Sequence, residues 1–277
     1  MKTCWLVYCE ADASGNDWYI NHYIECLKKY NIECRLIIKE SLSLVDGFNF
    51  MYKEEMLEKP DAVINRTRST SLAEYFENIG VKVFNNSKVT LYGNDKYLAY
   101  EFVKKLGIPV MDTILIRKNE EYEYNFSDIK VVKSLDGHGG TEVFTVKSRE
   151  EFDAIRSQMN CDIILQSYAS DIGKDLRVYT VGNEVIKGML RVSTKDFRSN
   201  FCLGGNAYEH ELSKKELDYA NRIMEALDIG HAAIDFIYDN GEPVFNEIED
   251  MCGSRMLYQN TDIDIVDMYT SFISKVI

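Results

Sequence analysis

The chain has 277 residues, 45% of them apolar and only 3 of them proline, so it can form one large or several small folded units with little disordered linker. Its 45 acidic and 32 basic side chains give a formal net charge of −13, which disfavours a nucleic-acid-binding protein. Seven cysteines without a Cys-x-x-Cys pair disfavour a disulfide framework and a zinc cage, and predict reduced thiols in a cytoplasmic protein. Neither a secretory signal nor an apolar run of membrane-spanning length is found, so no membrane association is expected.

Over the first 85 residues, predicted strands alternate with predicted helices. The strands lie at 4–9, 34–38, 62–64 and 81–84, and the helices at 17–30 and 71–79. This alternation predicts βαβ units, and therefore an N-terminal α/β domain with a parallel sheet over residues 1–90. Arg66 and Arg68 follow the third strand, at the sheet edge where open α/β sheets bind ligands. A turn leading into the next helix explains them equally, so their role stays open.

The second stretch, residues 91–168, changes to an α+β pattern. A helix is predicted over 94–106, because its apolar spacing ends at Gly107 with Pro109 beyond it. Strands are predicted at 113–116, 130–133, 142–146 and 163–166, with a helix at 150–159. Lys96 lies at the start of the first helix, where a helix N-terminus favours a phosphate, although a surface lysine is the commoner explanation.

A lysine and a glycine-rich loop follow each other in this stretch. Lys133 ends a predicted strand, and the loop after it contains Gly137, His138, Gly139 and Gly140. Glycines allow backbone N–H groups to approach phosphate oxygens, and the lysine supplies a positive charge. The loop lacks the Gly-Lys-Ser/Thr ending of a Walker loop. Taken alone, it is explained slightly better as a flexible hairpin loop with a chance lysine.

The third stretch, residues 169–277, also has an α+β pattern. Hairpin turns are predicted at 182–183 and 240–241, and helices at 214–227 and 263–276. Arg177, Lys187 and Arg191 alternate with apolar residues, which gathers positive charge on one sheet face. In so acidic a chain this pattern favours a phosphate-handling surface, with charge balance across the sheet as the alternative.

Three carboxylates lie on the second predicted hairpin: Asp235 on one strand, and Glu247 and Glu249 on the other. The two glutamates are two residues apart and therefore share a face. A two-residue turn at 240–241 would place Asp235 opposite Asn246 on the wrong face, whereas a three-residue loop would bring all three acids together. Clustered carboxylates favour a hard divalent cation such as Mg2+, with an acidic solvated strand as the alternative.

In their order and spacing, these features resemble the ATP-grasp superfamily, most closely its RimK-type carboxylate–amine ligases. The resemblance spans nearly the whole chain and rests on residues 94–96, the Lys133 strand with its glycine loop, 166–168, 175–177, 196–200, and the acids at 235, 247 and 249. It implies an ATP-grasp fold, in which the N-terminal α/β domain precedes a small subdomain at 91–168 and a large subdomain at 169–277.

The resemblance also implies a role for each candidate residue. ATP phosphates would be bound by Lys96, Lys133, Gly137, His138, Gly139 and Gly140. The adenine and ribose would be met by the hinge residues Gln166, Ser167 and Tyr168 and by Asp175. Two Mg2+ ions, or Mn2+ in their place, would be held by Asp235, Glu247 and Glu249. The transferred phosphate would lie beside Arg198, Ser199 and Asn200, with Arg177, Arg191 and Lys187 as further candidates for that surface.

Three positions depart from the family pattern. The usual Glu-x-Asn metal pair is here Glu247 and Glu249, and the usual hinge glutamate is Ser167. The extra charge of Glu249 would strengthen metal binding or alter the metal preference. Arg255 stands where Pro-Gly is usual, and is a candidate for binding a substrate carboxylate or the acyl phosphate.

The implied activity is ATP-dependent formation of an amide or peptide bond. A substrate carboxylate takes the γ-phosphate, ADP leaves, and an amine then attacks the acyl phosphate. The expected partners are small-molecule or peptide carboxylates and amines, without nucleic acid or membrane. The substrates' identity and a homo-oligomeric state stay open. Two alternatives remain, a kinase-like transfer to a hydroxyl and a non-catalytic nucleotide-binding module.

Overall fold

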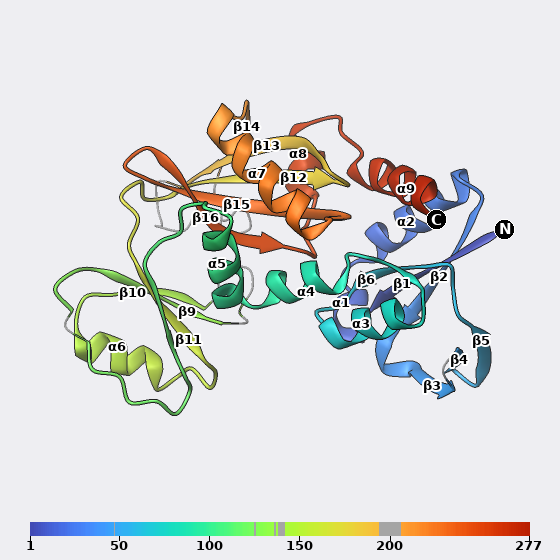
Figure 1. The fold of residues 1–277 in the computed structure, drawn as a ribbon, viewed down its shortest axis with the longest axis horizontal. Coiled ribbons are helices and arrows are strands. Elements are labelled where there is room, and N and C mark those ends of the chain that lie inside the picture. Colours follow the sequence, from blue (N-terminus) through green and yellow to red (C-terminus); the bar gives the residue numbers. More distant parts are fainter. Residues whose placement is uncertain (47, 125, 136, 138–141, 194–205) are drawn as a thin grey trace.

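The computed structural model describes residues 1–46, 48–124, 126–135, 137, 142–193 and 206–277 (Figure 1). Within these residues the strands form one parallel four-stranded sheet, antiparallel sheets of four and five strands, and a three-stranded antiparallel sheet. The predicted combination of α/β and α+β architecture is confirmed. The helices in the described part of the chain are all too short or too polar to cross a membrane.

The first sheet is the predicted parallel sheet. It consists of β1 (Lys2–Tyr8), β2 (Ile32–Ile38), β6 (Ala62–Arg66) and β7 (Lys82–Phe84), in the order β2-β1-β6-β7. Alternate residues of β1 enter different cores: Leu6 and Tyr8 pack in one, and Trp5 and Val7 in the other. A strand that is buried on both faces reads as a continuous apolar run, which is why the sequence predicted it correctly.

Helices cover the two faces of this sheet. On one face lie α2 (Asp17–Lys29) and the C-terminal α9 (Ile265–Val276), which pack against each other (Figure 1). On the other lie α3 (Thr70–Asn78) and the small sheet of β3 (Leu42–Asp46), β4 (Asn49–Tyr52) and β5 (Glu55–Glu58). The small sheet was not predicted, because its strands are short and mostly exposed. Phe50 and Tyr52 of β4 are its buried residues.

Two helices lead from the first sheet to the second. They are α4 (Ser87–Asn94) and α5 (Lys96–Lys105), so the single helix predicted over 94–106 is interrupted at its start. Asp95 causes the break, because its side chain caps α5 by accepting a hydrogen bond from the N–H of Leu98. The second sheet has the order β10-β9-β11-β8 and packs against α6 (Arg149–Arg156). Its strands are β8 (Thr113–Ile116), β9 (Lys130–Ser134), β10 (Val143–Val146) and β11 (Ile163–Ser167).

The third sheet is the largest, with the order β14-β13-β12-β15-β16. Its strands are β12 (Lys174–Val181), β13 (Glu184–Val192), β14 (Asn206–His210), β15 (His231–Asp239) and β16 (Glu242–Glu249). Leu176, Val178 and Ile234 point to one face, where α5 and α7 (Lys214–Leu227) cover them. The alternate positions on the same strands divide in two. Tyr179, Val181 and Ala233 join the core of the first sheet. Asp175, Arg177 and Asp235 form the polar face on which the candidate site is built.

A buried histidine gives the fold a predictable sensitivity to acid. His231, at the start of β15, is 1% exposed; its Nδ1–H donates to the Thr180 carbonyl at 2.8 Å, and its Nε2 accepts from the Cys252 thiol at 3.3 Å. Burial lowers the pKa of His231 from 6.5 to about 4, against the opposing effect of the Thr180 carbonyl. Between these two values the unfolded chain binds a proton that the folded chain does not, so stability falls as the pH falls.

We therefore expect acid to destabilise the parent protein more than a His231→Gln variant. Between pH 6.5 and pH 4 the histidine accounts for a loss of about 3 kcal/mol in the free energy of unfolding. Urea denaturation at several pH values measures the free energy of unfolding of both proteins. The carboxylates are the same in the two proteins, so their titration cancels in the difference. Parallel stability curves for parent and variant would contradict this assignment.

Candidate active site

A chain of ion pairs crosses the polar face of the third sheet. Arg177 on β12 faces Asp235 on β15 in the strand register, and Asp175 on β12 faces Arg191 on β13. Asp235 accepts from Arg177 Nε at 2.9 Å and Nη2 at 2.7 Å, and from Arg191 Nη2 at 2.6 Å. Arg191 also pairs with Asp175, and Arg177 also contacts Glu249 on β16. Three carboxylates therefore share two guanidinium groups.

The charges in this chain of ion pairs differ in how well they are neutralised. Asp235 is fully buried, and although burial alone would raise its pKa, Arg177 and Arg191 together hold the pKa below its usual value. Glu249 behaves oppositely: burial, with Asp235 and Glu247 nearby, raises its pKa despite the contact with Arg177. Its buried Oε2 makes an ion pair with that guanidinium but no hydrogen bond of good geometry. Glu249 is thus the least satisfied carboxylate of the group.

The hairpin of β15 and β16 settles the register that the sequence left open. Its turn is the two-residue alternative: Asp239 pairs with Glu242, and Asn240 and Gly241 have φ of 52° and 78°. The expected consequence, Asp235 opposite Asn246, is wrong, because a β-bulge after Asp235 shifts the register and Asp235 lies opposite Glu247. The three acids share a face, as the three-residue loop would have produced, but the cause is the bulge and not the length of the turn.

These acids do not form a ready-made three-ligand cage. In the described part of the chain, three potential metal-ligating atoms come within 4.8 Å of one another at His22, Cys26 and Asp264, and not at the three predicted acids. Both oxygens of Asp235 are occupied by guanidinium groups. Glu247 and Glu249 lie half-buried on the edge strand β16 and fit a hard cation better. Metal binding by Asp235 remains a prediction. It requires that Arg177 or Arg191 give up its hydrogen bond to one of the carboxylate oxygens of Asp235.

Two lysines connect the second sheet to this face. Lys133 on β9 donates from Nζ to Asn246 Oδ1 of β16 at 3.0 Å, across the two sheets. Asn246 is the bulge residue and directly precedes Glu247. No role was predicted for it, because an asparagine within a strand carries no distinguishing pattern. Lys96, the first residue of α5, contacts the carbonyl oxygen of Gly137. Lys133 therefore contacts the acidic strand, and Lys96 contacts the start of the glycine loop.

Contact of Lys133 with nucleotide phosphates remains a prediction, and the buried position of this lysine would make such binding sensitive to pH. Burial lowers the pKa of its ammonium group to about 8, against the effect of Glu247. Above this pH the ammonium loses its proton, so the Kd for an ATP analogue with Mg2+ should rise about tenfold per pH unit. Calorimetric titrations between pH 7 and 10 measure this, and a Lys133→Arg variant, which keeps its charge, should flatten the curve. A constant parent Kd over this range would contradict the prediction.

The predicted hinge residues lie at the end of β11, the central strand of the second sheet beside β8 and β9. Gln166 is buried and donates to the Thr113 hydroxyl at 3.0 Å. The Ser167 N–H donates to the Asp112 carbonyl at 2.8 Å, and its hydroxyl accepts from Lys130 at 3.3 Å. Tyr168 follows directly. A role of these residues toward adenine remains a prediction.

Several other predicted residues are placed away from the centre or outside the described residues. Lys187 shares the polar face, but its ammonium pairs with Glu209 on the edge strand β14. The residues outside the described part are His138, Gly139, Gly140, Arg198, Ser199 and Asn200. Arg177 and Arg191, predicted beside the transferred phosphate, are buried in ion pairs with carboxylates. Their contact with phosphate remains a prediction.

A cavity of about 430 Å³ lies beyond the end of the acidic strand. It lies between the C-terminal edge of the first sheet and the segment 251–258 that follows β16. Arg66 and Arg68 line the cavity from the C-terminal edge of the first sheet, the edge at which open α/β sheets bind ligands. Arg255 lines it from the start of α8 (Arg255–Asn260). The structure thus brings together three arginines whose roles the sequence left open.

Comparison with known proteins identifies the fold and the family. The RimK-like ATP-grasp domain family matches residues 93–273, about two thirds of the chain. The chain belongs to the RimK-like ATP-grasp family. A relative of this RimK-like protein, named "Probable alpha-L-glutamate ligase" in Maridesulfovibrio salexigens, is 28% identical over 243 residues, which cover 82% of this chain and 80% of the relative.

Solved ligase structures share the fold of this RimK-like protein. A RiPP-associated ATP-grasp ligase of Chryseobacterium gregarium, in complex with ADP and a leader and core peptide, has a TM-score of 0.72 at 14% identity, over 100% of this chain and 98% of that one. The D-alanine–D-alanine ligase of Bacillus anthracis, complexed with ATP, has a TM-score of 0.73 at 14% identity, over 100% and 99% of the two chains.

The predictions of fold, family and ligase class are confirmed for this RimK-like protein, and with them the expectation of an ATP-dependent carboxylate–amine ligase. ATP and Mg2+ are the cofactors of this ligase class, as predicted. The division of the chain at residues 90 and 168, and the roles of the individual site residues, remain predictions.

Proposed function

We propose that this chain joins a carboxylate of an amino acid or peptide to an amine, with the nucleotide bound between the second and third sheets. The observation that carries this proposal is the contact of Lys133 on β9 with Asn246 on β16. It puts a buried cation of one sheet against the strand of the other sheet that bears Glu247 and Glu249. Such a pairing of a lysine with metal-binding carboxylates suits a triphosphate and its cation.

The donor atoms fit Mg2+ at β16. Glu247 and Glu249 supply two carboxylates on one face; Oε2 of Glu249 pairs with Arg177 but makes no hydrogen bond. We propose that these two side chains hold one ion, and that a second ion, Mg2+ or Mn2+, would require Asp235 to exchange a guanidinium for the metal. When bound, the cation neutralises negative charge on the phosphate oxygens.

The reaction then needs little covalent chemistry from the protein. A carboxylate oxygen of the substrate attacks the γ-phosphorus, the bond to the β-phosphate oxygen breaks, and ADP leaves. The amine next attacks the acyl carbon, inorganic phosphate leaves with the bonding electron pair, and the amine gives up a proton. Lys133 and Lys96 would stabilise the phosphoryl oxygens, and the cavity beyond the end of β16 would hold a substrate.

A screen for ADP release tests this function. The protein is supplied with ATP, Mg2+ and pools of carboxylates and amines, and products are analysed for phosphate and for a new amide. Release of ADP and inorganic phosphate that depends on both substrates is expected, and the Lys133→Met variant should be inactive. A phosphorylated acceptor would instead establish the kinase-like alternative. Nucleotide binding without turnover in any pool would favour a binding module.

We also propose that the enzyme works in the cytoplasm. The six cysteines in the described residues are all free thiols, which fits a reducing compartment. ATP and amino acids are available there. Size-exclusion chromatography coupled to light scattering tests whether the chain forms a homo-oligomer.

A further inference from the structure

The cavity beyond the end of β16 contains two buried donors that find no acceptor within the protein. Arg66 is 7% exposed; its Nη2 donates to the Met251 carbonyl at 3.2 Å, but its Nε has no hydrogen-bond partner. Tyr8 is fully buried, and its hydroxyl also lacks a partner. Both residues line the cavity. Buried donors without partners are costly in a native fold. Unlike the unpartnered hydroxyl of Tyr23, these two belong to residues that line a cavity, where a ligand would supply their acceptor.

The charges around the cavity specify an anionic acceptor. Three arginines line it, Arg66, Arg68 and Arg255, and the facing acid is Asp12, which pairs with Arg68 at 3.1 Å. This positive excess stands out in a chain of net charge −13. Guanidinium groups bind planar carboxylates through two parallel hydrogen bonds. These donors therefore fit an anionic group, and a carboxylate is the one that an amino-acid or peptide substrate carries.

One wall of the cavity is aromatic. Trp18 is 61% exposed, stacks on His22 with ring centres 5.0 Å apart, and meets the edge of Tyr258 at 5.3 Å. Both Trp18 and Tyr258 line the cavity. A large indole left exposed beside a cavity is available for contact with an apolar or aromatic group of a ligand.

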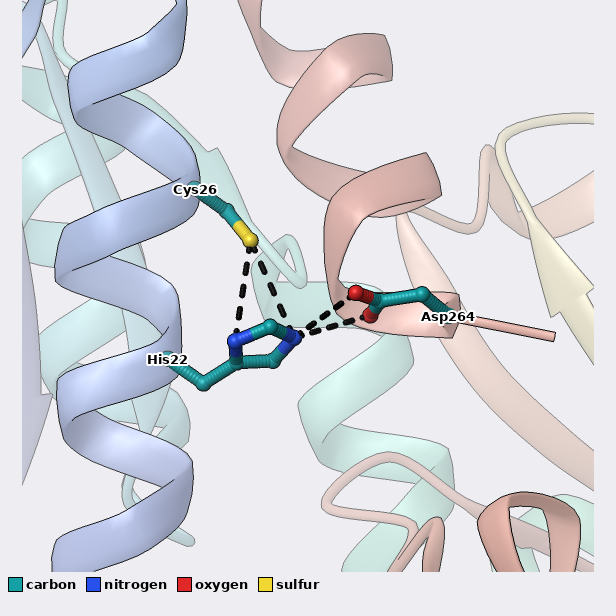
Figure 2. A group of neighbouring side chains, drawn as sticks. All are labelled: His22, Cys26 and Asp264. Atoms are coloured by element: carbon teal, nitrogen blue, oxygen red, sulfur yellow. Dashed lines mark hydrogen bonds and ion pairs between the residues drawn. The ribbon is translucent and has the colours of Figure 1, made fainter. Parts of the chain in front are cut away.

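A polar group behind this wall holds it in place. Figure 2 shows the His22 ring directed at Asp264, whose two carboxylate oxygens lie 2.9 Å from Nε2. Asp264 also accepts a hydrogen bond from the Tyr258 hydroxyl at 2.9 Å. Tyr258 is thus held by Asp264 directly, and Trp18 through its stacking on His22.

Cys26 lies beside His22, and these two residues and Asp264 could together ligate a metal ion. The Lys29 ammonium lies 3.7 Å from the Cys26 sulfur, and this positive charge disfavours a metal ion there. The group is best explained as a support for Trp18 and Tyr258.

We propose that this cavity is a substrate subsite for an amino acid or peptide end that carries a free carboxylate beside an aromatic or large apolar side chain. The carboxylate accepts from Arg66 and Tyr8, and the side chain lies against Trp18. This carboxylate anchors the substrate and does not react, because the donors hold its oxygens at the edge of the first sheet. The inference rests on the proposed ligase function, since it names one of that reaction's substrates.

The subsite is a feature of the part of the chain that precedes the family domain. Tyr8, Trp18, Arg66 and Arg68 all lie before residue 93, where the match to the family begins. The matched part contributes Met251, Gly253, Ser254, Arg255 and Tyr258 to the lining. Specificity for this anchor would therefore be set by the N-terminal residues of this chain.

Tryptophan fluorescence tests the subsite without measuring turnover. The chain has two tryptophans: Trp18 lines the cavity, and Trp5 is buried against Phe50 and Phe76. Titration of the full chain with glycyl-phenylalanine, with and without Mg2+ and ADP, should give a saturable change that a Trp18→Phe variant loses. The C-terminal amide of the dipeptide and glycyl-alanine should each bind at least tenfold more weakly. Absence of a saturable change in both conditions, or equal binding of dipeptide and amide, would overturn the proposal.

A matched pair of hydroxyl deletions sharpens the test. Tyr8→Phe removes a hydroxyl that makes no hydrogen bond in the fold, so we expect an unchanged melting temperature and about tenfold weaker binding of glycyl-phenylalanine. Tyr23→Phe removes another buried hydroxyl without a partner, but Tyr23 does not line the cavity, so binding should not change. Equal affinities of the two variants would refute the subsite. If they are equal while the parent still makes amides in the ADP-release screen, the ligase function stands and the subsite alone fails.

Discussion

Replacing Arg177 with methionine is expected to lower the free energy of unfolding by about 3–5 kcal/mol. The Arg177 side chain lies between Asp235 and Glu249 and is 8% exposed. Its removal leaves Asp235 with a single guanidinium, that of Arg191, and Glu249 with no positive partner in this ion-pair chain. A buried carboxylate that loses its counter-charge is far more costly than an exposed one. Urea denaturation at neutral pH measures the loss.

Two further variants show whether charge burial is the cause. Arg149→Met removes an exposed arginine that pairs with Asp153 on the same helix, and should cost less than about 1 kcal/mol. Combining Arg177→Met with Asp235→Asn should recover part of the loss, because the double variant no longer buries an underpaired negative charge. The explanation fails if Arg177→Met is no more destabilising than Arg149→Met.

Replacing Glu247 with glutamine is expected to reduce ADP release by a factor on the order of 100 to 1,000 while leaving the fold intact. Glu247 is half-buried opposite Asp235 and lies outside the hydrogen bonds that join Asp235 to its arginines. Its carboxylate also raises the pKa of Lys133, so the substitution removes a cation ligand and weakens the positive charge of the lysine together. The ADP-release assay with saturating Mg2+ and ATP measures the effect.

Glu242→Gln is the matched control, because it lies on the same strand but is exposed and pairs with Lys215. It should keep parent activity. Asp235→Asn is a poorer test of metal binding than Glu247→Gln, since it also disturbs two arginines that stabilise the sheet. Turnover of Glu247→Gln at the parent rate, with Mg2+ affinity unchanged, would remove Glu247 from the metal site.

Much of the fold could be predicted because several elements carry strong local signals. The helix predicted over 214–227 has those bounds in the structure, where Ser213 and Glu216 form a capping box at its start. The turn at Gly182 pairs Val181 with Glu184, as a two-residue hairpin requires. By contrast, β3 to β5 escaped prediction, since only Phe50 and Tyr52 of their residues are buried and short exposed strands show little periodicity.

The candidate site was predictable as a set of residue types but not as a set of contacts. Lys133 and the acids of β16 were named from the sequence, but the contact of Lys133 with that strand was not predicted. Asn246, the contact between the sheets, was missed because an asparagine within a strand carries no distinguishing pattern. Arg177 and Arg191 neutralise Asp235, a contact that was not predicted, and their contact with phosphate remains a prediction.

The amino-acid sequence by itself determined the alternation of strands and helices, the buried faces of β1 and β12, and the membership of the RimK-like ATP-grasp family. These features depend on the spacing of apolar residues and on short motifs, which are local properties of a chain. Tertiary structure alone decided that a bulge at Asn246 brings Asp235 opposite Glu247, and that α9 packs on α2. It also decided that Arg66 and Tyr8 share a cavity with Arg255. Register, helix docking and cavities follow from contacts between residues far apart in sequence, and no local pattern records which distant partner a side chain will meet.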